Sequence, residues 1–82
     1  MKHTRQSTQR NEIGKRIRKI RQSIRPPISQ DDLAGRLARQ GVALDRSAIS
    51  RIENQDRYVL DYEVIAIAKS LQVSVAELYA ER

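Results

Sequence analysis

Apolar residues recur along the chain at helical spacing, and the first run of them marks one face of an amphipathic helix. This run consists of isoleucines separated by four, three and four positions, Ile13, Ile17, Ile20 and Ile24. The residues between them are mostly Lys and Arg, so the opposite face is cationic. Pro26 and Pro27 then end the helix, because proline lacks an amide proton and restricts the residue before it.

A second helix is predicted after the two prolines. Ser29 with Asp32 approximates a capping box, in which each residue satisfies a backbone amide of the other. Gly41 is a natural end, since glycine adopts the left-handed conformation that closes a helix. The predicted inward face consists of Leu33, Ala34, Leu37 and Ala38.

A third helix is predicted roughly from Asp45 to Asn54, with Asp45 as its N-cap. Its apolar edge is thin and consists of Ala48, Ile49 and Ile52. Its other face is polar and carries Arg46, Ser47, Ser50 and Arg51. A helix with this division can bury one stripe and leave the rest of its surface free.

Two more helices complete the prediction. The fourth is expected to begin at Asp61 as its cap and to turn four apolar residues inward, Val64, Ile65, Ala68 and Leu71. Ser74 and Glu77 form a second capping box for a short fifth helix that carries Val75, Leu78 and Tyr79. No segment alternates as a strand does, so we predict an all-α fold, a compact five-helix bundle.

The charge is unevenly distributed along the 82 residues. Residues 1–25 hold nine bases and one acid, whereas the remaining residues hold seven bases and nine acids. Residues 1–11 have no aliphatic residue after Met1 and nothing to bury, so we predict a disordered basic arm there and one folded domain over 12–82. A basic end on a balanced domain favours a polyanionic partner.

The chemistry needed for an enzyme is sparse. There is no cysteine, and the single histidine, His3, lies in the predicted arm. Asp31 and Asp32 are adjacent, so they point in different directions from a helix, and acids in a first turn are favoured by the helix dipole. We expect no catalytic site, no cofactor and no metal site. No apolar run approaches the roughly 20 residues that cross a membrane, so we expect a soluble cytoplasmic protein.

Two short helices joined by a connection, the second with a free polar face, are typical of proteins that read DNA. Side chains near the start of the second helix reach base edges, and arginine can bind guanine through two hydrogen bonds. From Ile17 onward the chain also resembles the Xre family, the lambda-repressor and Cro type of helix-turn-helix domain. The resemblance rests on ISQDDLAGRLA at 28–38, SAISRIEN at 47–54, and two flanking segments, IRKIRQ at 17–22 and VIAIAKSLQVSVAELY at 64–79.

The resemblance implies a role for individual residues. The base-contacting positions of the family match Arg46, Ser47 and Arg51, with Ser50 between them in contact with a base or the backbone. The phosphate-contacting positions are assigned to Arg18, Arg21, Gln30, Asn54 and Arg57. In the family, the glutamine matched by Gln30 also braces the recognition helix, and the residue matched by Asn54 caps its end. Arg21 matches an arginine that pairs with the glutamate of the Ile-Glu-Asn motif, here Glu53. The Gln30 and Arg46 positions lie sixteen residues apart, about five more than is commonest in the family.

These observations predict a sequence-specific regulator of transcription, repressor-like, that binds double-stranded DNA at a palindromic operator as a homodimer and is associated with the nucleoid when bound. The alternative is an interaction module, an antitoxin or anti-repressor, whose main contact is a protein partner. Tyr58, Tyr62 and Tyr79 could serve that interface, although we expect each to be a partly buried packing residue. RNA is the third possibility, but we expect no exposed aromatic platform for stacking bases.

Overall fold

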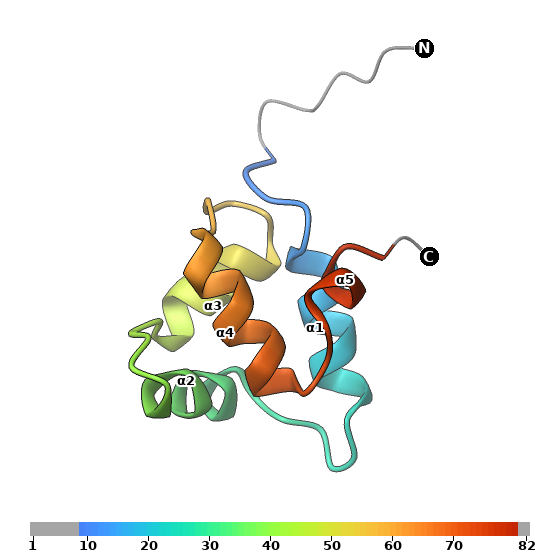
Figure 1. The fold of residues 1–82 in the computed structure, drawn as a ribbon, viewed down its shortest axis with the longest axis vertical. Coiled ribbons are helices and arrows are strands. Elements are labelled where there is room, and N and C mark those ends of the chain that lie inside the picture. The colour runs from blue at the N-terminus through green and yellow to red at the C-terminus, as the bar shows by residue number, and fades with distance from the viewer. Residues whose placement is uncertain (1–8, 81–82) are drawn as a thin grey trace.

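The computed structural model describes residues 9–80 and, within that range, contains five α-helices and no strand. The helices are α1 (Gly14–Ser23), α2 (Gln30–Arg39), α3 (Arg46–Glu53), α4 (Asp61–Leu71) and α5 (Val75–Leu78). Figure 1 shows them gathered into one compact body. The all-α prediction with five helices is therefore confirmed.

The core is formed by the buried faces of α1, α2, α3 and α4 together with Leu78 of α5. Helix α3 packs against α1 and α2, α2 also packs against α4, and α5 packs against α4. Leu33, Leu37 and Leu78 have no exposed surface. The other predicted core residues that are buried are Ile13, Ile17, Ile20, Ala48, Ile49, Ile52, Val64, Ala68 and Leu71. Burial of an aliphatic side chain of this size contributes about 1.5–3 kcal/mol, so this cluster supplies the main stabilisation.

The helix ends follow the predicted capping residues closely. The Ser29 hydroxyl accepts a hydrogen bond from the Asp32 amide at 2.9 Å, and the Asp32 carboxylate accepts one from the Ser29 amide at 3.0 Å. The backbone hydrogen bond to Asp32 is the largest of the effects that lower the pKa of this carboxyl. Ser74 and Glu77 form the same reciprocal pair at α5. Gly41 has a φ of 80°, the left-handed conformation expected after α2.

Helix α4 differs from the prediction at its start and on one face. Asp61 is the first helical residue and not the cap; the amide of Leu60 is instead satisfied by the Glu63 carboxylate at 3.0 Å. Ile65 was predicted to point inward but is 49% exposed, while Ala66 and Ile67 are buried. Aliphatic residues occur on most sides of this helix, so the periodicity alone does not show which aliphatic side chain faces outward.

Two further burial predictions are wrong. Ala38, expected on the inward face of α2, is exposed, whereas Leu33 and Leu37 are buried and Ala34 is partly buried against the core. The three tyrosines, expected to be partly buried, are all more than half exposed: Tyr58 at 68%, Tyr62 at 55% and Tyr79 at 51%. The core is thus built without any aromatic ring, and the rings lie on the surface.

The predicted arm is shorter than 1–11, because Asn11 belongs to the folded part. Its side chain is buried and accepts hydrogen bonds from the amides of Ile13 and Gly14 at 3.1 and 2.8 Å. The same side chain donates to the carbonyls of Ile52 and Arg57 at 3.1 and 2.8 Å. Asn11 therefore joins the start of α1 to the end of α3. Residues 1–8 of the predicted arm lie outside the described residues.

Candidate nucleic-acid interface

Helix α3 has one packed face and one free face. Ala48, Ile49, Ile52 and Glu53 are buried against α1 and α2. The four residues predicted to contact bases, Arg46, Ser47, Ser50 and Arg51, share the opposite side, where all are exposed except the half-buried Ser50. At about 100° per residue, Arg46 and Arg51 mark the two edges of this side and the serines lie between them.

The edge at Arg46 borders two hollows that meet at Gln30. One is lined by Gln30, Asp45, Arg46, Ser47 and Ser50. The other lies towards α1 and is lined by Arg18, Arg21, Ser29, Gln30, Asp31 and Arg46. Because Gln30 and Arg46 line both, the free face of α3 continues into a cationic depression between α1 and α2.

Both helices that border these hollows present their N-terminal ends to them. Asp45 caps α3 by accepting from the Ala48 amide at 2.8 Å, and Ser29 caps α2. Within residues 9–80, the next amides, those of Gln30, Asp31, Arg46 and Ser47, have no hydrogen-bond partner. Free amides at a helix start, together with the helix dipole, bind anions such as phosphate.

A buried network fixes the position of α3 beside α2. Arg21 donates to both oxygens of the Glu53 carboxylate, from Nε at 2.8 Å and from a terminal nitrogen at 2.9 Å, and also to the carbonyl of Ile28 at 3.0 Å. Gln30 donates from Nε2 to the same carboxylate at 3.0 Å. The predicted pair between Arg21 and Glu53 is confirmed, and so is the bracing contact of Gln30 with α3. The hydrogen bond to Glu53 raises the pKa of Arg21 above its usual value, although burial opposes it.

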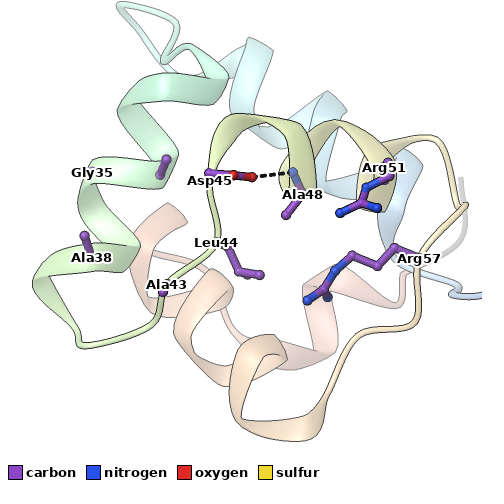
Figure 2. A pocket seen from close by; sticks show the side chains of 9 residues that line it. Gly35, Ala38, Ala43, Leu44, Asp45, Ala48, Arg51 and Arg57 are labelled. Atoms are coloured by element: carbon purple, nitrogen blue, oxygen red, sulfur yellow. Dashed lines mark hydrogen bonds between the residues drawn. The ribbon is translucent and has the colours of Figure 1, made fainter.

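The opposite edge of α3, at Arg51, borders a third hollow (Figure 2). It is lined by small and aliphatic residues from α2, the connection and α3, Ala34, Gly35, Ala38, Ala43, Leu44 and Ala48, together with Asp45, Arg51 and Arg57. In Figure 2 the Arg51 and Arg57 side chains both extend over this hollow. The connection between α2 and α3, residues 40–45, forms one of its walls.

Arg57 is held in place by Glu63. It donates to the Glu63 carboxylate at 3.0 Å and to the carbonyl of Tyr58 at 2.8 Å. Burial alone would raise the pKa of Glu63, but the hydrogen bonds from Arg57 and the Leu60 amide outweigh it and hold that pKa below its usual value. This pair was not predicted from the sequence, because nothing in the pattern around Glu63 indicates that its side chain is buried.

The remaining predicted site residues divide into free and braced groups. Within the described range, the side chains of Arg18, Arg46 and Arg51 are exposed and form no hydrogen bond or ion pair. Asn54 is exposed and is the C-cap of α3, as predicted. Arg21 is only 8% exposed and engaged in the network with Glu53, so its main contacts are internal. The interface therefore has free cations on both edges of α3.

Asn11 and Gly14, which were not predicted to be structurally important, contact the C-terminal end of α3. A β-carbon on Gly14 would collide with the carbonyl oxygen of Ile52 and lie 3.1 Å from that of Glu53. Glycine at this position lets the start of α1 approach the last turn of α3. The available signal was the three-residue spacing from Asn11 to Gly14, which is typical of an N-cap and the amide it satisfies.

Comparison of the chain with models of protein families, with curated proteins and with solved structures found no match. Among residues 9–80, no helix is long and apolar enough to span a membrane. The same residues contain no group of three or more His, Cys, Asp or Glu side chains that could hold a metal ion.

Proposed function

We propose that this protein binds double-stranded DNA through a helix-turn-helix of the lambda-repressor kind, with α3 as the recognition helix in the major groove. The observation that carries the proposal is the free face of α3. Its serines lie between two unpaired arginines, Arg46 and Arg51, and the face adjoins the free backbone amides in the first turns of α2 and α3. Free cations beside free amides favour the phosphates of a nucleic acid as the partner of this face.

In this proposal the two edges of α3 follow the two DNA backbones that border the groove. On the Arg46 side, Arg18, Gln30 and the free amides of α2 and α3 bind phosphates of one strand. On the Arg51 side, Asn54 and Arg57 bind the other strand. Arg21 acts as a positioning residue, since its contacts orient Glu53 and Gln30.

Sequence preference comes from the side chains that reach the base edges. Arg46 and Arg51 extend over the groove from either edge and bind guanine through O6 and N7, which contributes about 1–3 kcal/mol of discrimination per pair. Ser47 and Ser50 lie between them, and their hydroxyls both donate and accept hydrogen bonds. Two copies on a palindromic operator would place their recognition helices about 34 Å apart, one turn of the duplex. Such binding at a promoter would regulate transcription, most simply by repression.

Salt-dependent binding to a labelled duplex tests the proposal. We expect Arg46→Ala and Arg51→Ala each to weaken binding by about tenfold or more, because each removes a charged contact to DNA. Arg39→Ala is the matched control: Arg39 is exposed in the last turn of α2 but lines none of the hollows beside α3. If all three variants lost affinity equally, the binding would be a non-specific attraction by net charge and the proposal would be wrong.

A further inference from the structure

Helix α4 carries an outward stripe that has no partner in the described part of the chain. Asp61, Ile65 and Lys69 are spaced by four residues and are exposed, while almost every other residue of the helix is buried. Residues at this spacing lie on one side of a helix, one turn after another. The stripe therefore reads acid, aliphatic, base from the N-terminal to the C-terminal end of α4.

Large apolar side chains continue the stripe at its N-terminal end. Tyr62 is 55% exposed beside Ile65, and Leu60 precedes the helix with an exposure of 51%. Leaving several such side chains in water forgoes the free energy that their burial would yield. Ile65, Tyr62 and Leu60 do not line the hollows beside α3. The stripe and the free face of α3 can therefore be occupied at the same time.

The order of charges on the stripe is self-complementary under a two-fold axis. Ile65 lies midway between Asp61 and Lys69, about 6 Å along the helix from each. If a second α4 runs antiparallel with its Ile65 opposite this Ile65, each Asp61 faces the second copy's Lys69. A parallel arrangement would instead put acid against acid and base against base.

We propose that two copies of this protein pair through α4, with Ile65 at the two-fold axis, Tyr62 beside it and two symmetric contacts between Asp61 and Lys69. The side chains of Asp61 and Lys69 form no ion pair within residues 9–80, so both are available. An isologous pair of this kind uses the same patch on both copies. A patch of a few side chains is small beside the roughly 800 Å² per partner of a standard interface, so the free protein pairs weakly.

Sedimentation equilibrium of the full chain without DNA, from low micromolar to millimolar concentration, tests the pairing. We expect a monomer–dimer equilibrium whose dissociation constant rises about tenfold in Asp61→Lys and in Lys69→Asp, because each change makes both symmetric contacts repulsive. An equimolar mixture of these two variants should pair again, since each acid then faces a base. The double variant Asp61→Lys with Lys69→Asp should also pair with itself.

Matched controls separate the pairing from changes in folding. Asp31→Lys and Lys19→Asp make the same charge changes at exposed positions of α2 and α1, outside α4, and should leave the dissociation constant unchanged. Ile65→Ser should abolish pairing while the helical circular dichroism is retained. A wild-type chain that stays monomeric at every concentration, or single-charge variants that fail to pair when mixed, would overturn the inference.

Failure here is distinguishable from failure of the proposed function. The pairing depends on the exposed stripe of α4 and is measured without DNA, whereas the proposed function depends on Arg46 and Arg51. A chain that binds DNA but never pairs would leave the α4 patch to an unlike protein. If the chain pairs but does not bind DNA, the proposed pairing through α4 stands and the proposed DNA binding is wrong.

Discussion

The guanidinium of Arg21 and the carboxylate of Glu53 form a two-point ion pair in the interior, with distances of 2.8 and 2.9 Å. Arg21 comes from α1 and Glu53 from the last turn of α3, and Gln30 at the start of α2 donates to the same carboxylate. One buried acid thus fixes three helices relative to one another. This contact therefore sets the orientation of α3, and with it the side to which its free face points.

Removing the arginine of this pair should strongly destabilise the fold. In Arg21→Met the Glu53 carboxylate stays buried without its partner, which costs about 3–5 kcal/mol of the free energy of unfolding. Urea denaturation followed by circular dichroism measures the loss. Arg18→Met, an exposed position on the same helix, should change the free energy of unfolding by less than about 0.5 kcal/mol. Similar values for both variants would show that the pair does not organise the bundle.

Two glycines of the chain should respond to alanine with opposite signs. Gly14→Ala brings a β-carbon into the Ile52 carbonyl and should destabilise the fold, since the contact is with backbone that cannot move aside. Gly35 lies within α2 with nothing within 4 Å of an added β-carbon. Gly35→Ala should therefore stabilise by about 0.5–1 kcal/mol through its higher helix propensity. Thermal unfolding of the two variants gives both signs directly, and a stabilising Gly14→Ala would contradict the close approach of α1 to α3.

The side chain of Asn11 should matter more than its place near the chain start implies. Asn11→Ala removes four hydrogen bonds and leaves buried carbonyls and amides at the junction of α1 and α3 without partners, at a cost of about 2–3 kcal/mol. Gln9→Ala, an exposed neighbour, should have little effect. Denaturation in urea compares the two. If Asn11→Ala were as stable as Gln9→Ala, the hydrogen bonds of Asn11 would not stabilise the fold.

Acid should weaken the fold partly through Glu63. Its pKa in the folded state lies below its usual value, so its stabilising contribution is complete above the unfolded pKa of about 4.3 and is lost as the pH falls through the folded value. In Glu63→Gln this contribution is absent, so the free energy of unfolding should fall less between pH 6 and pH 3 than it does in the wild type. Arg57→Gln removes the same pair from the other side and should also flatten the profile. If the free energy of unfolding fell equally with pH in all three proteins, the ion pair between Arg57 and Glu63 would not be stabilising.

The sequence predicted the helices well because their ends carry residues with a local mechanism. Ser29, Asp45 and Ser74 satisfy amides within their own first turns, and Gly41 supplies a left-handed residue, so each acts without help from the rest of the fold. Burial was predictable where one stripe is clearly apolar, as in α1 and α3. These features depend on neighbours in sequence, which a single chain displays.

The errors arose where the outcome depends on residues distant in sequence. Ile65 is apolar yet exposed, whereas Glu63 is charged yet buried, because Arg57 and the Leu60 amide satisfy its carboxylate. Asn11 is buried because carbonyls more than forty positions away accept from it. For the candidate site, the pair of Arg21 with Glu53 was predictable only through the family resemblance, since periodicity places these residues on separate helices.

Selection from a random duplex library, with the bound sequences read out, tests the central proposal most directly. We expect a palindromic sequence to be recovered, and Arg46→Ala and Arg51→Ala each to relax the preference at a particular position of the half-site while the rest is retained. Recovery of no motif, with weak binding that disappears at modest salt, would contradict the proposal that α3 reads DNA and would leave only a basic surface.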